Sequence, residues 1–117
     1  MAQAPLIRIG DTLIVTAQEA ISDTGVIELE DQIAEAIERA GASGLIIDIT
    51  VLDIVDSFLG RMLNDIAATA RLMGARTVLV GIQPAVAITL TELGLQLKGI
   101  RTALNVAQAL RLLDRAG

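Results

Sequence analysis

The sequence predicts an α/β domain in which about four helices pack against a mixed, mostly parallel sheet. Three features lead to this prediction: a nearly continuous apolar segment at residues 45–49, helical spacing of apolar residues on both sides of it, and glycines where those helical patterns end. Strands and helices alternate toward the C-terminus, an order that favours right-handed crossovers between parallel strands. With 117 residues the chain suits one compact domain, so we expect residues 1–117 to form a single unit.

The N-terminal third is predicted to contain a β-hairpin followed by a helix. Apolar residues at positions 6, 7, 9 and 13–16 indicate two short strands, and Gly10-Asp11 is typical of a two-residue turn between them. The helix begins near residues 22–25 and ends at Gly41, with apolar residues at helical spacing: Val26, Leu29, Ile33, Ile37 and Ala40. Its other face is acidic and carries Glu28, Asp31, Glu35 and Glu38. A solvated surface is favoured there over a docking surface.

The remainder of the chain continues the alternation of strands and helices. The strand at 45–49 is expected to be central, because it is apolar on both of its faces. A second helix begins near Ser57 and ends at 73–74, and it buries Phe58 or Leu59 with Met62, Leu63, Ile66 and Ala70. A strand at 76–80, a helix at about 85–93 preceded by Pro84, a short strand at 100–103 and a helix capped by Asn105 complete the order.

The composition limits the kinds of partner that we expect for this chain. Hydrophobic residues make up 53% of the chain but aromatic residues only 1%, so the core is expected to be aliphatic and some aliphatic surface is expected to be covered by self-association. The formal net charge of −5 argues against nucleic acid as a partner. The apolar stretches are too short to span a membrane, and we expect no targeting segment, so the default expectation is a cytoplasmic protein.

The absence of certain residue types narrows the chemistry. The sequence has no His and no Cys, which removes Ser-His and Cys-His nucleophile pairs and most zinc sites. Neither a GxxxxGK[ST] loop nor a GxGxxG segment after a strand occurs. We therefore expect no enzymatic activity, no cofactor and no metal.

Two loops are expected to carry function, since functional residues in open α/β sheets gather beyond the carboxyl ends of the strands. These loops are residues 50–57 and 81–84. Three carboxylates near the first loop, Asp48, Asp53 and Asp56, are the basis of an alternative in which the protein is a Mg²⁺-dependent or phospho-accepting enzyme. No lysine lies near them in the sequence to balance a phosphoryl group, and this disfavours the alternative.

Ser57 lies where the first loop meets the second helix, and it has two interpretations. As a plain N-cap, its replacement by Ala would cost about 1 kcal/mol. As an acceptor of phosphate, it would place the new charge at the positive end of a helix but beside Asp56 and Asp53. Physical reasoning alone favours the cap.

The segments LIIDITVLDIVDSFLGRML and MGARTVLVGIQPAVAITLTELG resemble the STAS domain of anti-sigma-factor antagonists. Within that family the chain is most similar to the small stressosome scaffolds typified by RsbS, and the resemblance covers nearly its whole length. Its strongest parts are IVDSF and GIQPAVAITL. The length fits the short scaffold, so we expect no additional N-terminal sensory domain of the kind that the larger co-scaffold subunits carry.

The resemblance implies a non-catalytic scaffold and phospho-switch protein. In the family the serine of the DSF segment is phosphorylated by the kinase that the scaffold sequesters and then releases, so this role is carried over to Ser57. Thr89 is a second candidate for phosphorylation, although a hydroxyl bonded back to the preceding helical turn is favoured for it. The residues expected to bind partners lie in the same two segments: Asp53, Asp56, Phe58, Gln83 and Pro84.

The implied partners are a serine/threonine switch kinase of the RsbT type, RsbR-like co-scaffold STAS proteins, a phosphatase that resets Ser57, and further copies of the chain in a dimer or larger oligomer. An alternative within the family is a simple antagonist that binds an anti-sigma kinase and so frees a sigma factor. The native mass of the protein with its partners distinguishes the two, because only the scaffold forms a very large complex.

Overall fold

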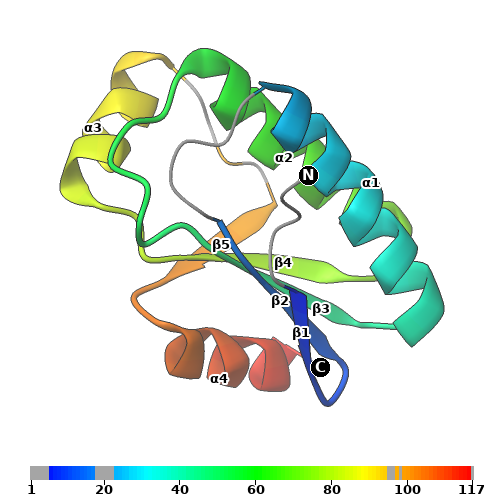
Figure 1. The fold of residues 1–117 in the computed structure, drawn as a ribbon. Coiled ribbons are helices and arrows are strands. Elements are labelled where there is room, and N and C mark those ends of the chain that lie inside the picture. Colours follow the sequence, from blue (N-terminus) through cyan, green and yellow to red (C-terminus); the bar gives the residue numbers. More distant parts are fainter. Residues whose placement is uncertain (1–5, 18–22, 95–96, 98, 117) are drawn as a thin grey trace.

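A computed structural model describes residues 6–17, 23–94, 97 and 99–116. They form a five-stranded sheet in the order β1-β2-β3-β4-β5 with helices on both faces (Figure 1). The strands are β1 (Leu6–Ile9), β2 (Thr12–Thr16), β3 (Gly44–Asp48), β4 (Arg76–Val80) and β5 (Ile100–Ala103). The helices are α1 (Asp23–Ala40), α2 (Ser57–Leu72), α3 (Pro84–Glu92) and α4 (Val106–Ala116).

The topology confirms the predicted α/β fold. β1 and β2 form an antiparallel hairpin in which Ile9 pairs with Thr12, and the remaining neighbours are parallel. β3 is central, as expected, but it begins and ends one residue earlier than predicted. Gly44 already pairs with strands on both sides, whereas the carbonyl of Ile49 accepts the amide of Leu52 in a turn at 2.9 Å.

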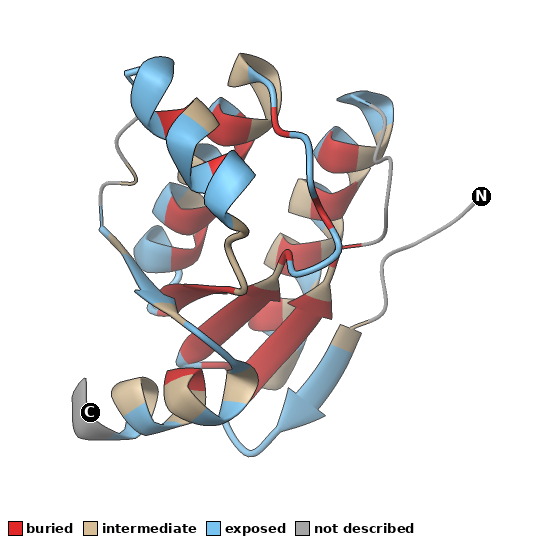
Figure 2. Ribbon diagram, turned by 90° about the vertical axis from the view of Figure 1, so that its left-hand side faces the viewer, coloured by how far each residue is buried: buried red, intermediate tan, exposed pale blue. Residues whose placement is uncertain are grey.

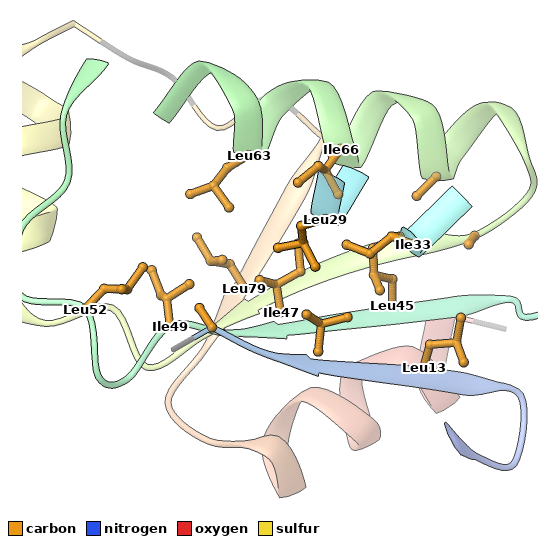
Figure 3. Packing of buried hydrophobic residues seen from close by; sticks show 14 of the residues in the cluster. Leu13, Leu29, Ile33, Leu45, Ile47, Ile49, Leu52, Leu63, Ile66 and Leu79 are labelled. Carbon is orange, nitrogen blue, oxygen red and sulfur yellow. The ribbon is translucent and has the colours of Figure 1, made fainter. Parts of the chain in front are cut away.

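The side chains of the inner strands alternate between two hydrophobic clusters. Leu45 and Ile47 of β3 face α1 and α2, where they pack with Ile33 and Ile66 (Figure 3). Ile46, between them, faces the opposite side and packs in a smaller cluster with Ala109 of α4. Consistent with the single aromatic residue of the chain, both clusters are aliphatic.

Burial falls from the centre of the sheet to its edges (Figure 2). β2, β3 and β4 are almost entirely buried, whereas β1 and β5 are mostly exposed or half-buried. α3 buries only Val86 and Leu90. Because aliphatic side chains fill almost all of the interior of the sheet, most polar side chains lie at the strand ends and on the outer surfaces.

Candidate functional site at the carboxyl ends of the central strands

The loop after β3 begins with a turn built by Asp48. One carboxylate oxygen of Asp48, Oδ1, accepts the backbone amide of Thr50 at 2.9 Å and also its hydroxyl. Short side-chain to backbone bonds of this type stabilise a turn and end a strand. Asp48 therefore fixes the direction in which the chain leaves the sheet.

The loop after β4 packs against this turn and is hydrogen-bonded to it. The side-chain amide of Gln83 donates to the carbonyl oxygen of Thr50 at 2.6 Å. Gly81 has a φ of 78°, and a Cβ built on it would overlap the Thr50 side chain and lie 3.1 Å from the Thr50 Cα. Only glycine fits this close approach without strain, so the two predicted loops form one surface. We call residues 49–59 and 81–84 the strand-end surface.

Asp56, and not Ser57, caps α2. Asp56 has extended backbone angles, φ −99° and ψ 178°, and its Oδ1 accepts the amide of Leu59 at 2.8 Å. Ser57 is the first residue of the helix and is half-buried. The interpretation of Ser57 as the N-cap is therefore wrong. The carboxylate one position earlier has the extended backbone that a cap needs, and it already satisfies the helix amide.

The other residues that the sequence singles out lie on the same surface. Asp53 and Pro84 are exposed, while Phe58 and Gln83 are half-buried. Of the two residues predicted as alternatives for burial at the start of α2, Leu59 is the one that packs against the main cluster. The strand-end surface thus brings together the acidic loop, the start of α2 and the start of α3.

Ile54 is a prominent residue that the sequence analysis did not single out. Its side chain is 80% exposed in the loop between two acidic residues, and Val51 earlier in that loop is 51% exposed. A bulky aliphatic side chain this exposed favours contact with another molecule. The sequence feature that could have indicated this exposed side chain is an isoleucine between Asp53 and Asp56 that belongs to no helical or strand periodicity.

The carboxylates do not support the alternative of a metal-dependent enzyme. Across the described residues, no three acidic side chains are grouped so that they hold a metal ion. Asp48 and Asp56 each use Oδ1 for a local backbone bond, to Thr50 and Leu59 respectively. Their arrangement is that of a turn and a helix cap.

Thr89, the second candidate for phosphorylation, lies in the middle of α3. Its hydroxyl donates to the carbonyl oxygen of Ala85 at 2.9 Å. The favoured interpretation of this hydroxyl, a bond back to the preceding turn, is confirmed. Thr91 forms the same kind of bond with Ala87 at 3.0 Å, so the arrangement is a local feature of α3.

The acidic face of α1 is largely solvated. Glu35 lies 3.9 Å from Arg39 in a surface ion pair, and Asp31 is exposed. Partial burial, with the nearby carboxylates of Asp65 and Asp31, raises the pKa of Glu30. The folded state therefore holds this proton more tightly than the unfolded chain. Glu30 favours the fold below the ordinary glutamate pKa, and this advantage is lost as the pH rises through the raised value.

None of the helices in the described segments is both long and apolar enough to cross a bilayer.

The profile of the STAS domain matches residues 3–109, and the chain belongs to this family. The family resemblance and the fold predicted from the sequence are thus confirmed. More particularly, the chain is similar to a solved serine-to-glutamate variant of Moorella thermoacetica RsbS. The two are 39% identical, the match covers 98% of this chain and 97% of that chain, and the TM-score is 0.85.

Two further comparisons point to the same group of proteins. A chain from a structure of the stressosome, described as a signal integration and transduction hub, is 42% identical, with 96% of this chain and 97% of that chain covered and a TM-score of 0.83. RsbRA of Bacillus subtilis (strain 168), an RsbT co-antagonist protein, is 28% identical over 114 residues. That match covers 88% of this chain but only 42% of RsbRA, so the chain spans less than half of that relative.

The capping geometry predicts effects of different size on stability for two neighbouring substitutions. Asp56→Ala removes the acceptor for the Leu59 amide and is expected to lower the free energy of unfolding by about 1 kcal/mol. Ser57→Ala leaves the cap intact and is expected to change it by less than about 0.5 kcal/mol. Urea denaturation of both variants measures the difference. An equal loss for both, or a larger loss for Ser57→Ala, would contradict the assignment of the cap.

Proposed function

We propose that this protein is a non-catalytic scaffold and phospho-switch subunit of a bacterial stressosome. It binds and sequesters a serine kinase of the RsbT type, which phosphorylates it at Ser57 and is then released to signal stress. A phosphatase resets Ser57, and RsbR-like co-scaffold STAS proteins complete the assembly. The similarity to RsbS and to a stressosome chain over almost the whole length supports this role.

The position of Ser57 is the observation that most strongly supports the proposal. The residue begins α2 but is not needed as its cap, so its hydroxyl is available for modification without loss of the fold. The positive end of the helix dipole favours a phosphate there. Glutamate was substituted for a serine in the Moorella protein, and the number of that serine is one higher than that of Ser57. Glutamate adds negative charge, as a phosphate does.

The charges on the strand-end surface support a mechanism by which a phosphate would release the kinase. A phosphate adds a charge of about −1.5 to −2 beside the carboxylates of Asp53 and Asp56. A partner that docks against Ile54 and Phe58 must then bury this charge or lose part of its contact. Release needs only a few kcal/mol, because each 1.4 kcal/mol changes the affinity about tenfold.

Phosphorylation by the kinase is expected to occur at Ser57. Incubation with an RsbT-type kinase and ATP, followed by mass spectrometry of peptides, should place the phosphate there. Ser57→Ala should remain unlabelled and keep the kinase bound, whereas Ser57→Asp should release it at least in part. Ser43→Ala, at an exposed serine before β3, and Thr89→Ala are matched controls that should be labelled like the unmodified chain. Labelling of Ser57→Ala with normal release would refute the assignment.

Ile54 is expected to contribute to kinase binding. Ile54→Asp places a charge in the centre of the proposed docking surface and should weaken binding by about tenfold or more. Leu72→Asp is the matched control, since Leu72 is 89% exposed but lies at the other end of α2. Both side chains are exposed, so both variants should fold. Surface plasmon resonance with immobilised kinase measures the two affinities, and equal values would exclude a specific role for Ile54.

The scaffold function also predicts a large assembly. Light scattering of the chain mixed with RsbR-like proteins should give a complex far heavier than a dimer, because exposed aliphatic residues outside the strand-end surface, such as Ile7 and Leu104, remain to be covered. The alternative, a simple antagonist, predicts a small species that binds an anti-sigma kinase and forms no complex with co-scaffold proteins. That second result would replace the scaffold function with the antagonist function.

A further inference from the structure

A cavity of about 410 Å³ lies at the opposite end of the molecule from the strand-end surface. It is formed where β4 begins, by the C-terminal halves of α2 and α4 and by the start of β5. Apolar side chains such as Ile100, Leu112 and Leu113 form part of its lining. The volume lies within the range of roughly 300–1,000 Å³ that is usual for sites of small organic ligands.

Three arginines line this cavity: Arg71, Arg76 and Arg101. They are a third of the nine basic residues in a chain that has 14 acidic ones. Within the described segments, the side chains of Arg71 and Arg101 form neither an ion pair nor a hydrogen bond. The register pairs Thr77 with Ile100 and Val78 with Arg101, so Arg101 projects from the α4 side of the sheet, whereas Arg71 belongs to α2 on the other side. The cavity therefore carries positive charge on both sides of the sheet edge, and this charge favours a bound anion.

Gly99 gives the guanidinium of Arg71 its position at the cavity wall. The backbone of Gly99 has a φ of 72°, and a Cβ built on it would overlap the Arg71 guanidinium. The flat group therefore lies against a residue without a side chain, at the entrance to β5. This contact places the Arg71 guanidinium beside the start of β5, where the residue lines the cavity.

Thr77 supplies a second and independent observation. It also lines the cavity, and only 3% of the residue is exposed. Its hydroxyl is buried without a hydrogen-bond partner in the described part of the chain. A buried hydroxyl without a partner is unfavourable, and it is a group that a ligand oxygen satisfies.

We propose that this cavity binds a small organic oxyanion, a phosphate monoester or a carboxylate on an apolar body. Arginine forks match the paired oxygens of either group. The aliphatic part of the lining and the volume suit an attached apolar body, which a bare inorganic ion lacks. The cavity is separate from the proposed kinase surface: Ser57 and Arg71 are 14 residues apart on α2, which is about 21 Å along the helix.

Titration calorimetry of the full chain with four probes tests this inference. The probes are 1-naphthyl phosphate, 1-naphthoate, inorganic phosphate and the neutral 1-naphthalenemethanol. At least one naphthyl anion should bind as one molecule per chain and more tightly than inorganic phosphate or the alcohol. Which of the two binds more tightly identifies the preferred head group. No saturable binding of either anion at millimolar concentration, or equal binding of the alcohol or of inorganic phosphate, would overturn the proposal.

Matched arginine variants locate the site. Arg71→Gln and Arg101→Gln should each weaken binding by about tenfold or more, while Arg71→Lys should fall between because it keeps the charge and loses the fork. Arg61→Gln is the control, since Arg61 is an exposed arginine of the same helix that does not line the cavity. An equal loss in Arg61→Gln would indicate general charge attraction and refute the site. Circular dichroism confirms that each variant is folded.

Discussion

The structure depends on an aliphatic sheet whose inner strands are covered on both faces. Ile46 and Ile47, adjacent in β3, face opposite clusters and are each exposed by 2% or less. Removing apolar surface from water is the main term that favours such a fold, at about 25 cal/mol per Å². The same burial leaves few polar groups within the sheet, and Thr12 and Thr77 are the buried polar residues among those described. Any binding surface must therefore lie at the strand ends, at the edges or on the outer faces of the helices.

At the carboxyl ends of the strands, a few polar contacts join the loops after β3 and β4 into one surface. Asp48 turns the chain at Thr50, and Gln83 and Gly81 hold Thr50 from the next loop. The bond within the turn is local, whereas Gln83 and Gly81 reach Thr50 from the other loop, and together these contacts fix the position of the loop that leads to α2. Ser57 owes its position to them and to the cap supplied by Asp56. A phosphate at this residue would change the charge of the surface and leave the turn and the cap in place, since neither uses the Ser57 hydroxyl.

The order of the elements was predictable from the sequence because it rests on local patterns. Apolar spacing and Gly41 gave the extent of α1, and Asn105 was correctly expected to cap α4, where it accepts the amide of Gln108 at 2.8 Å. The sequence was ambiguous where two neighbours suit the same role. Asp56 and Ser57 are both favourable caps, and only their backbone angles distinguish them.

Long-range contacts could not be predicted from the sequence. The approach of Gly81 to Thr50 joins residues 31 positions apart, and the arginine cavity joins segments from α2 to α4. Both arise from parallel strand order, which places distant residues side by side.

The cavity and Ser57 lie at opposite ends of α2. Their separation of about 21 Å exceeds the Debye length of about 8 Å at physiological salt, so their charges are largely screened from each other. Any influence of one on the other has to pass through the packing of α2, whose buried residues Leu63, Ile66 and Ala70 belong to the cluster that covers the sheet. Such close packing resists small displacements, and the two ends of α2 are therefore expected to bind their partners independently.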